Sequence, residues 1–223
     1  MGKINIKKTN ANVAMGDYPL ADAVFEIWGA IGGGDSVILG LVDTVTTDAK
    51  GEAQSKALKL GNYTIKEKTA PYGFVLNTNS FTAKLEYAGQ DEEFAYTTVT
   101  IAEEPQRGVI RLTKTNSNPS IGDYALNGAV FEIRNSAGTL VDTITTNASG
   151  QANSKELPLG SYTVTEKTAP YGFVRNKNTF GAQLTYAGQT VSVTYTDVVI
   201  AERPQTGKIT VTNHASVTCG LSQ

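Results

Sequence analysis

Lysine and glutamate recur at matched positions in the two halves of this 223-residue chain. Glu103 and Glu202 each end a segment in which aliphatic and polar residues alternate. Because successive side chains of a strand point to opposite faces, both glutamates should point inward with the aliphatic residues. Lys8 and Lys114 recur in the same way. An amine and a carboxyl group that are buried together could react with each other.

Burial would change the ionisation of such groups. The pKa of a buried lysine falls, and the pKa of one of two neighbouring carboxyl groups rises. A neutral amine can then face a protonated acid, and contact between them supplies an effective molarity large enough to form an amide without an enzyme. The alternative is a buried ion triad of one lysine and two glutamates. The residues alone leave both interpretations open.

The chain contains one folding unit written twice. The run Glu67–Val75 returns letter for letter as Glu166–Val174. A period of about 100 residues is too long for a solenoid repeat, so each copy should be an autonomous domain. We expect domain 1 at residues 1–105, domain 2 at residues 106–206, and a tail at residues 207–223 that begins like the first strand of a third unit.

Short strand patterns fill both copies, and no amphipathic stretch reaches helical length. The segment Tyr63–Glu67 is typical of them, because β-branched residues alternate with polar ones between turn residues. This density of short strands predicts an all-β chain of two immunoglobulin-like β-sandwiches. The connector Glu104–Gly108 is short and contains proline, which restricts hinge motion. We therefore expect the domains to lie end to end.

The order of these segments resembles the B-type repeat of Gram-positive collagen adhesins and pilins, also called the CnaB or SpaA-like prealbumin-like domain. A first strand that ends in lysine is followed by Leu20–Ile27 or Leu126–Ile133, then Leu-Gly-x-Tyr-Thr, then Glu-Lys-Thr-Ala-Pro-Tyr-Gly-Phe. The resemblance implies a structural stalk segment of an adhesin or pilus-like protein on the bacterial cell surface. The cell wall would be reached through other parts of the parent protein. The resemblance also implies no enzyme activity beyond an autocatalytic intramolecular cross-link.

In that family, a lysine on the first strand and an Asn or Asp on the last strand join through an amide, and a glutamate before Ala-Pro moves the protons. By position, the resemblance implies an amine, a proton shuttle and a carboxyl partner in each domain: Lys8, Glu67 and Glu103, and then Lys114, Glu166 and Glu202. This chain has glutamate where the family usually has asparagine. Glutamate is one methylene longer than aspartate, and a displacement of about 1 Å can slow such a reaction about a hundredfold. Isopeptide bonds and buried Lys/Glu triads both remain possible interpretations of these residues.

Two other cross-links are weaker alternatives. Thr9 and Gln106, with their counterparts Thr115 and Gln205, could form esters, although glutamine after proline is expected in a solvated connector. Cys219 and Gln223 have the residue types of an internal thioester, but a leftover thiol is the simpler interpretation. We expect neither bond.

The main difference between the copies is the segment Trp28–Leu41, which gives domain 1 about seven extra residues and the only tryptophan of the chain. Its glycine run between apolar segments predicts an elongated hairpin. An exposed apolar hairpin could contact a host extracellular-matrix or surface protein, with Trp28 as the candidate ligand contact. Alternatively, Trp28 covers the sheet edge of its own domain.

Composition excludes several classes of function. A formal net charge of −2 without a basic stripe argues against nucleic acid as a partner. No apolar run is long enough to insert into a membrane. The lone His214 and the spacing of acidic residues predict neither a metal site nor a cofactor. We expect a monomer without a bound cofactor.

Overall fold

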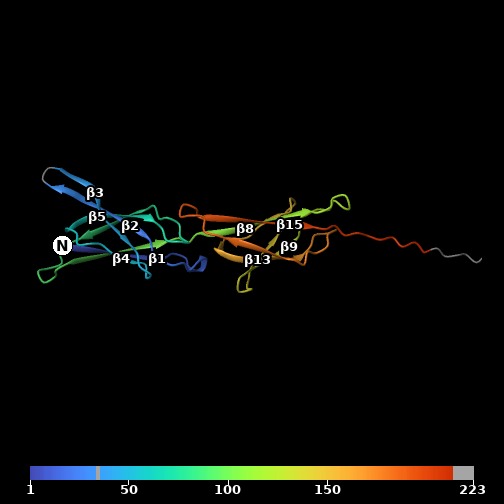
Figure 1. The fold of residues 1–223 in the computed structure, drawn as a ribbon, viewed down its shortest axis with the longest axis horizontal. Helices are drawn as coiled ribbons and strands as arrows, with labels where there is room; N and C mark the ends of the chain where they lie inside the picture. The colour runs from blue at the N-terminus through green and yellow to red at the C-terminus, as the bar shows by residue number, and fades with distance from the viewer. Residues whose placement is uncertain (34–35, 213–223) are drawn as a thin grey trace, which may run out of the picture.

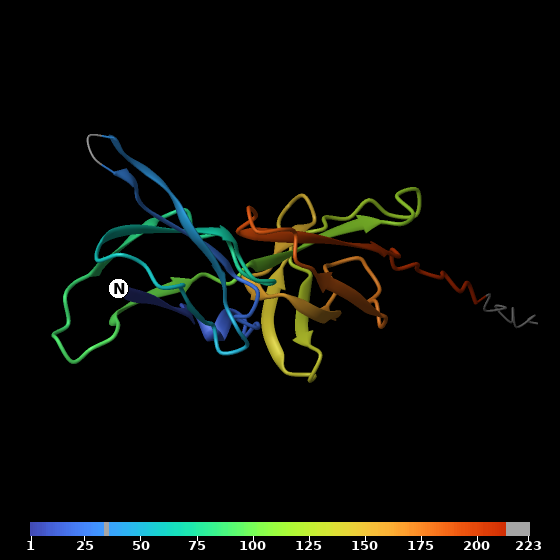
Figure 2. The ribbon, with the colours of Figure 1, turned by 60° about the vertical axis from the view of Figure 1, so that its left-hand side comes forward.

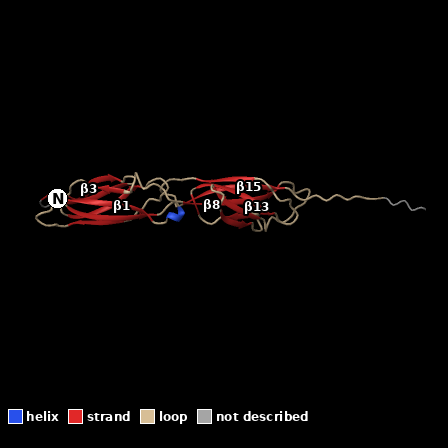
Figure 3. Cartoon of the chain, turned by 90° about the horizontal axis from the view of Figure 1, so that it is seen from below, coloured by secondary structure: helices blue, strands red, loops and turns tan. Residues whose placement is uncertain are grey.

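The chain forms two β-sandwiches that lie end to end as an elongated rod (Figure 1). This computed structural model describes residues 1–33 and 36–212. Strands fill both bodies (Figure 3), and the described residues contain no α-helix, only a short 3-10 turn at Val13–Met15. His214, Cys219 and Gln223 lie outside the described residues. The predicted all-β architecture of two tandem sandwiches is confirmed.

Domain 1 consists of two facing sheets, ordered β4-β1-β7 and β3-β2-β5-β6. Glycine and asparagine residues separate its strands, which leaves most of them between six and eleven residues long. The strands are β1 (Gly2–Asn10), β2 (Val24–Gly33), β3 (Ser36–Thr46), β4 (Glu52–Gln54), β5 (Gly61–Thr69), β6 (Ser80–Leu85) and β7 (Ala95–Glu103).

Domain 2 repeats the same strand order. One sheet is ordered β10-β9-β13-β14, and in the other β8 pairs with β11, β12 and β15. The short β12 corresponds to an isolated bridge between Gly2 and Leu58 in domain 1. The strands are β8 (Arg107–Asn116), β9 (Val130–Asn135), β10 (Leu140–Thr145), β11 (Gln151–Asn153), β12 (Leu157–Pro158), β13 (Gly160–Thr168), β14 (Thr179–Leu184) and β15 (Val193–Glu202).

The core of each sandwich lies between its sheets, where the inward residues of alternating strands meet. In domain 1 the side chains of Ile4, Phe25, Ile65 and Ile101 are fully buried. They come from β1, β2, β5 and β7, so every major strand contributes one face to the core. A polar side chain in phase with these residues is therefore carried into the same apolar interior.

The first and last strands of each domain are parallel neighbours. In domain 1, β1 pairs with β7 over nine positions, from Gly2 opposite Ala95 to Asn10 opposite Glu103. In domain 2, β8 pairs with β15 in the same parallel arrangement. The two strands that are farthest apart in each domain's sequence are thus adjacent in its sheet.

The extra segment of domain 1 is an elongated hairpin, as predicted. β2 and β3 stay paired beyond the sandwich as far as Gly33 opposite Ser36, and the hairpin projects away from the rod (Figures 1 and 2). Ile38 and Leu39 on its outer part are 64% and 67% exposed. Trp28 is half-buried at its base, where Nε1 donates a hydrogen bond to Glu26 Oε2 at 3.2 Å.

The repeated Ala-Pro-Tyr-Gly-Phe run has a steric requirement for its glycine. Gly73 has φ +91°, and a Cβ atom there would lie 2.4 Å from the ring of Tyr18. Gly172 meets Tyr124 in the same way at φ +84°. Only glycine fits both constraints, which explains why the tyrosine and the glycine recur together in the two copies.

The connector between the domains corrects one sequence-based expectation. Gln106 is not solvated but fully buried, because domain 2 packs directly on it. Its Nε2 donates to the carbonyl oxygens of Gly188 and Val191, and its Oε1 accepts from the backbone N of Ala187 at 2.7 Å. The side chain is therefore directed at the loop of residues 187–191 and not at Thr9 on the first strand of domain 1.

Candidate functional site

Three strands bring one lysine and two glutamates together in domain 1. Lys8 lies near the end of β1, Glu67 on β5, and Glu103 at the last position of β7. Each residue keeps the phase of the core residues before it, so its side chain enters the sandwich, and all three side chains have no exposed area. The parallel pairing of β1 and β7 places the lysine beside Glu103, as the sequence pattern predicted for an inward acid.

The lysine contacts both carboxyl groups. Lys8 Nζ donates a hydrogen bond to Glu67 Oε1 and lies 3.2 Å from Glu103 Oε1. The other oxygen of Glu67 accepts a hydrogen bond from the backbone N of Asn77 at 2.9 Å. Glu67 is therefore held at both oxygens, whereas among the described residues neither oxygen of Glu103 accepts a hydrogen bond.

Domain 2 repeats this geometry. Lys114 Nζ donates to Glu166 Oε1 at 2.6 Å and lies 3.0 Å from Glu202 Oε1. Glu166 Oε2 accepts from the backbone N of Asn176 at 2.7 Å. Both oxygens of Glu202 lack hydrogen bonds within the described part of the chain. The sequence-predicted residues thus come together in two separate sets, one in each domain.

The environment favours a protonated carboxyl group on the last strand. Burial raises the pKa of Glu103 from its ordinary value of 4.5 to about 7, the charge of Lys8 opposes this rise, and the charge of Glu67 adds to it. Burial likewise raises the pKa of Glu202. The ring centroid of Phe25 lies 5.4 Å from Lys8 Nζ, so the amine sits against an aromatic wall and not in water.

This arrangement places a nucleophile, a base and an electrophile in contact. Lys8 Nζ is the only nitrogen nucleophile among the three side chains, Glu67 can take its proton, and a protonated Glu103 offers a carbonyl carbon. The same contacts also suit a hydrogen-bonded ion triad. Beside the triad, a surface hollow of about 240 Å³ is lined by residues 75–79 and 102–104.

Sequence reasoning missed the residues that hold Glu67 and Glu166 in place. Asn77 and Asn176 each lie ten positions after the glutamate that their backbone N–H binds. Both asparagines recur at matched positions in the sequence, so this signal was present. What the sequence did not reveal is that the backbone N–H, and not the amide side chain, makes the contact.

Other classes of site find no support in the described part of the chain. It contains no cluster of three or more His, Cys, Asp or Glu residues that could hold a metal ion. The same residues include no helix of the length and apolarity needed to span a membrane. The buried Lys/Glu sets are therefore the strongest chemical feature of the described residues.

Comparison with known proteins agrees with the duplicated fold. A family model described as the SpaA prealbumin-like fold domain matches residues 2–100 and again residues 108–199. The chain belongs to the SpaA prealbumin-like family. The two matches end shortly before the last-strand glutamates, Glu103 and Glu202.

Individual relatives cover the SpaA-type domains to different extents. The trypsin-resistant surface T6 protein of Streptococcus pyogenes is 32% identical over 84 residues, which are 34% of this chain and 16% of that protein. The Bacillus anthracis TIE protein has a TM-score of 0.67 at 26% identity over 91% of this chain and 34% of that one. A C-terminal fragment of the pilus adhesin SpaC from Lactobacillus rhamnosus has a TM-score of 0.48 at 17% identity, covering 94% of this chain and all of that fragment. This chain thus spans about a third or less of the T6 and TIE proteins.

Proposed function

We propose that this chain is a structural stalk segment of a bacterial cell-surface adhesin or pilus-like protein, stabilised from within by its two Lys/Glu sets. The fully buried lysine between two glutamates, repeated in both domains, is the observation that carries the proposal. Two SpaA-type sandwiches in line and similarity to a streptococcal surface protein support it. The segment works outside the cell as a monomer without a cofactor. Other parts of a longer protein provide attachment to the cell wall.

The internal chemistry is an amide between the first and last strands. In domain 1, Glu67 takes a proton from the Lys8 ammonium, and the free amine attacks Cδ of protonated Glu103. Glu67 passes a proton from the attacking nitrogen to the departing hydroxyl. The products are an amide, one water and a protonated Glu67. Contact at 3.2 Å before the reaction gives the effective molarity that the step requires.

Domain 2 carries out the same reaction with Lys114, Glu166 and Glu202. Because the two sets lie in separate cores, each bond forms independently of the other. Where the amide does not form, the same side chains remain as a buried ion triad. In both states they act on their own domain and on no external substrate.

Intact-protein mass tests the proposed bond. The unaltered chain should be two waters lighter than its sequence, and Glu67→Gln or Glu166→Gln should each restore one water because its own domain loses the shuttle. Glu86→Gln is the matched control, since Glu86 is an exposed glutamate of domain 1, and it should leave both bonds intact. Peptide mapping should join Lys8 to Glu103. Full theoretical mass in the unaltered chain would contradict the covalent bond and leave the triad.

A second candidate function is ligand binding by the hairpin of domain 1. Its support is the set of exposed apolar side chains on a projecting element that domain 2 lacks: Ile31, Ile38, Leu39 and Leu41. Trp28 at the base would complete the contact with a host extracellular-matrix or surface protein. Pull-down of host proteins by the chain, with the Trp28–Leu41 segment replaced by Asn135–Gly138 of domain 2, tests this function. Unchanged capture would exclude the hairpin.

A further inference from the structure

The two domains are held together by a loop of domain 2 that docks on domain 1. We call residues 185–192 between β14 and β15 the docking loop. Its Gln189 accepts two hydrogen bonds, at Oε1 from the backbone N of Ala70 and at its carbonyl oxygen from the backbone N of Leu76, both at 2.8 Å. The ring of Tyr186 lies 4.7 Å from the ring of Tyr72. The loop therefore binds domain 1 through backbone and aromatic contacts.

Two more side chains complete the junction, Tyr18 from domain 1 and Gln106 from the connector. The hydroxyl of Tyr18 accepts a hydrogen bond from the backbone N of Leu159 at 2.9 Å. The buried Gln106 side chain makes three hydrogen bonds to the backbone of the docking loop. The junction is thus a defined set of paired groups and not a loose tether.

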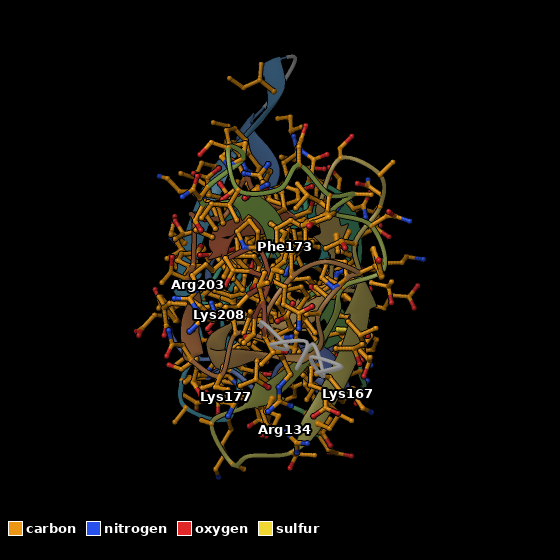
Figure 4. The ribbon with its side chains drawn as sticks, turned by 90° about the vertical axis from the view of Figure 1, so that its right-hand side faces the viewer. Arg134, Lys167, Phe173, Lys177, Arg203 and Lys208 are labelled. Carbon is orange, nitrogen blue, oxygen red and sulfur yellow. The ribbon has the colours of Figure 1, made fainter. Side chains whose placement is uncertain are left out.

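Each half of this junction recurs at a free end of the rod. The end face that receives a docking loop recurs on domain 2, and a docking loop recurs on domain 1. The end face of domain 2 carries Tyr124, Tyr171 and Gln205 at the positions of Tyr18, Tyr72 and Gln106. Here Tyr171 is 91% exposed, against 65% for Tyr72 at the internal junction, and Gln205 is exposed where Gln106 is fully buried. Figure 4 views this end of the rod, where Phe173, Arg203 and Lys208 lie. At the opposite end, domain 1 has its own docking loop at residues 86–93, with the same Tyr-Ala-Gly-Gln sequence.

The two free ends also carry opposite charges. The docking loop of domain 1 contains Asp91, Glu92 and Glu93, where that of domain 2 has the neutral Thr190, Val191 and Ser192. The end face of domain 2 carries Arg175, Lys177 and Arg203, where domain 1 has Leu76, Thr78 and Glu104. An acidic loop therefore fits the free face better than a neutral loop would, because opposite charges across an interface favour association and fix its register.

The start of the tail indicates where a further domain with such an acidic loop would be attached. Gly207–Ile209 has the same three residues as Gly2–Ile4 at the start of domain 1, and the spacing from Pro204 to Gly207 equals that from Pro105 to Gly108. Ile209 and Val211 alternate as core residues of a first strand do, yet they are 90% and 86% exposed. Their counterparts Ile4 and Ile6 are buried to within 1%.

We propose that the free end face of domain 2 is the docking surface for a third SpaA-type domain of a longer protein that contains this chain; the third domain begins at Gly207 and presents an acidic docking loop like that of domain 1. The proposal rests on the end-to-end stalk but not on the cross-link. Tyr171 packs on the loop's tyrosine, Gln205 binds its backbone, and the backbone N–H groups of Ala169 and Arg175 donate to its glutamine, as Ala70 and Leu76 do at the internal junction.

Amide hydrogen exchange tests the docking directly. In an extended chain, residues 207–223 are replaced by a second copy of residues 2–105, which keeps Gly207–Ile209 unchanged. Exchange at Ala169 and Arg175 should slow by about tenfold or more relative to the unextended chain. The amides of Ala70 and Leu76, already bonded to Gln189, are the internal control and should be protected in both chains. Slow exchange in the core strands of the added copy shows that it has folded.

Two variants isolate the proposed contacts. Gln205→Ala in the extended chain should restore fast exchange at Ala169 and Arg175 while the added core stays protected. A second extension uses residues 108–206, which already form domain 2 in this chain and carry the neutral docking loop. This extension should protect the amides of Ala169 and Arg175 less than the first one does. Raising the salt concentration should reduce the difference in protection between the two extensions.

Three results would overturn the proposal. In the first, a folded added domain leaves Ala169 and Arg175 as exposed to exchange as in the unextended chain. In the second, Gln205→Ala leaves their protection unchanged. In the third, the unextended chain itself shows protection that grows with concentration, which would assign the face to a second copy of the molecule. Intact mass reports the cross-link separately, so failure of docking and failure of the internal bond are distinguishable.

Discussion

The two domains are alike inside and differ at their surfaces. Both place a lysine between two glutamates from equivalent strands. In both, one of these glutamates, Glu67 or Glu166, accepts a hydrogen bond from the backbone N–H of an asparagine. They differ in the hairpin that only domain 1 carries and in the charges of their docking loops. Repetition thus identifies the residues that stabilise each sandwich. The differences identify where one domain can do something that the other cannot.

Removal of a lysine should have the largest effect, and only in its own domain. Lys8→Ala leaves Glu67 and Glu103 buried without a cation and prevents the amide, so domain 1 should lose roughly 3–5 kcal/mol of unfolding free energy. Trp28 is the only tryptophan of the chain, so its fluorescence during urea unfolding reports domain 1. Lys114→Ala is the matched control, and should leave the Trp28 transition in place while circular dichroism shows early loss of domain 2. Equal destabilisation of both domains by either variant would contradict independent sets.

A pH titration should separate a linked domain from an unlinked one. Glu103 has a pKa of about 7 when folded and near 4.5 when unfolded, so between these values the folded state binds the extra proton. Its contribution to stability is therefore present below about pH 4.5 and is lost as pH rises through about 7. Because an amide cannot titrate, a cross-linked domain 1 should lack this decline. Urea unfolding of the unaltered chain and of Glu67→Gln across this pH range checks it, and a decline in a chain of reduced mass would contradict the assignment of the bond to Glu103.

Loss of the junction glutamine should have a smaller effect, confined to the internal junction. Gln106→Ala removes three hydrogen bonds to part-buried backbone groups of the docking loop, which should cost about 1–3 kcal/mol of domain coupling. Exchange at Ala70 and Leu76 should become faster. Gln205→Ala in the unextended chain is the control, because Gln205 is exposed, and it should change neither these amides nor stability. Identical behaviour of the two variants would contradict the specific role of Gln106.

Shortening the hairpin should have the smallest effect on stability. Replacement of Trp28–Leu41 by the tight turn Asn135–Gly138 of domain 2 removes mainly exposed residues, so the unfolding free energy should change by about 0.5 kcal/mol or less. Thermal unfolding measures this change. A loss several times larger would show that Trp28 and its hydrogen bond to Glu26 stabilise the sheet beneath.

The sequence predicted most of the fold because duplication and strand alternation are local signals. The recurring Lys8, Glu67 and Glu103 positions predicted a buried set, and the structure brings those side chains into contact. The burial of Gln106 could not be predicted, since it depends on a loop about 80 residues away in the sequence. The connector around it contains proline and the charged Glu104 and Arg107, which is typical of a solvated segment. Only the packing of one domain on the next changes its environment.

The parallel pairing of first and last strands determines how the rod would respond to pulling. Gly2 enters β1 at one end of domain 1, and Glu103 leaves β7 at the other end. Stretching the chain therefore slides these strands past each other in shear, so that the rungs of the ladder share the load at once and are not unzipped one by one. The short connector passes from β7 straight into β8, whose pairing with β15 repeats the geometry. Both described domains would therefore carry a pulling force through the same shear geometry.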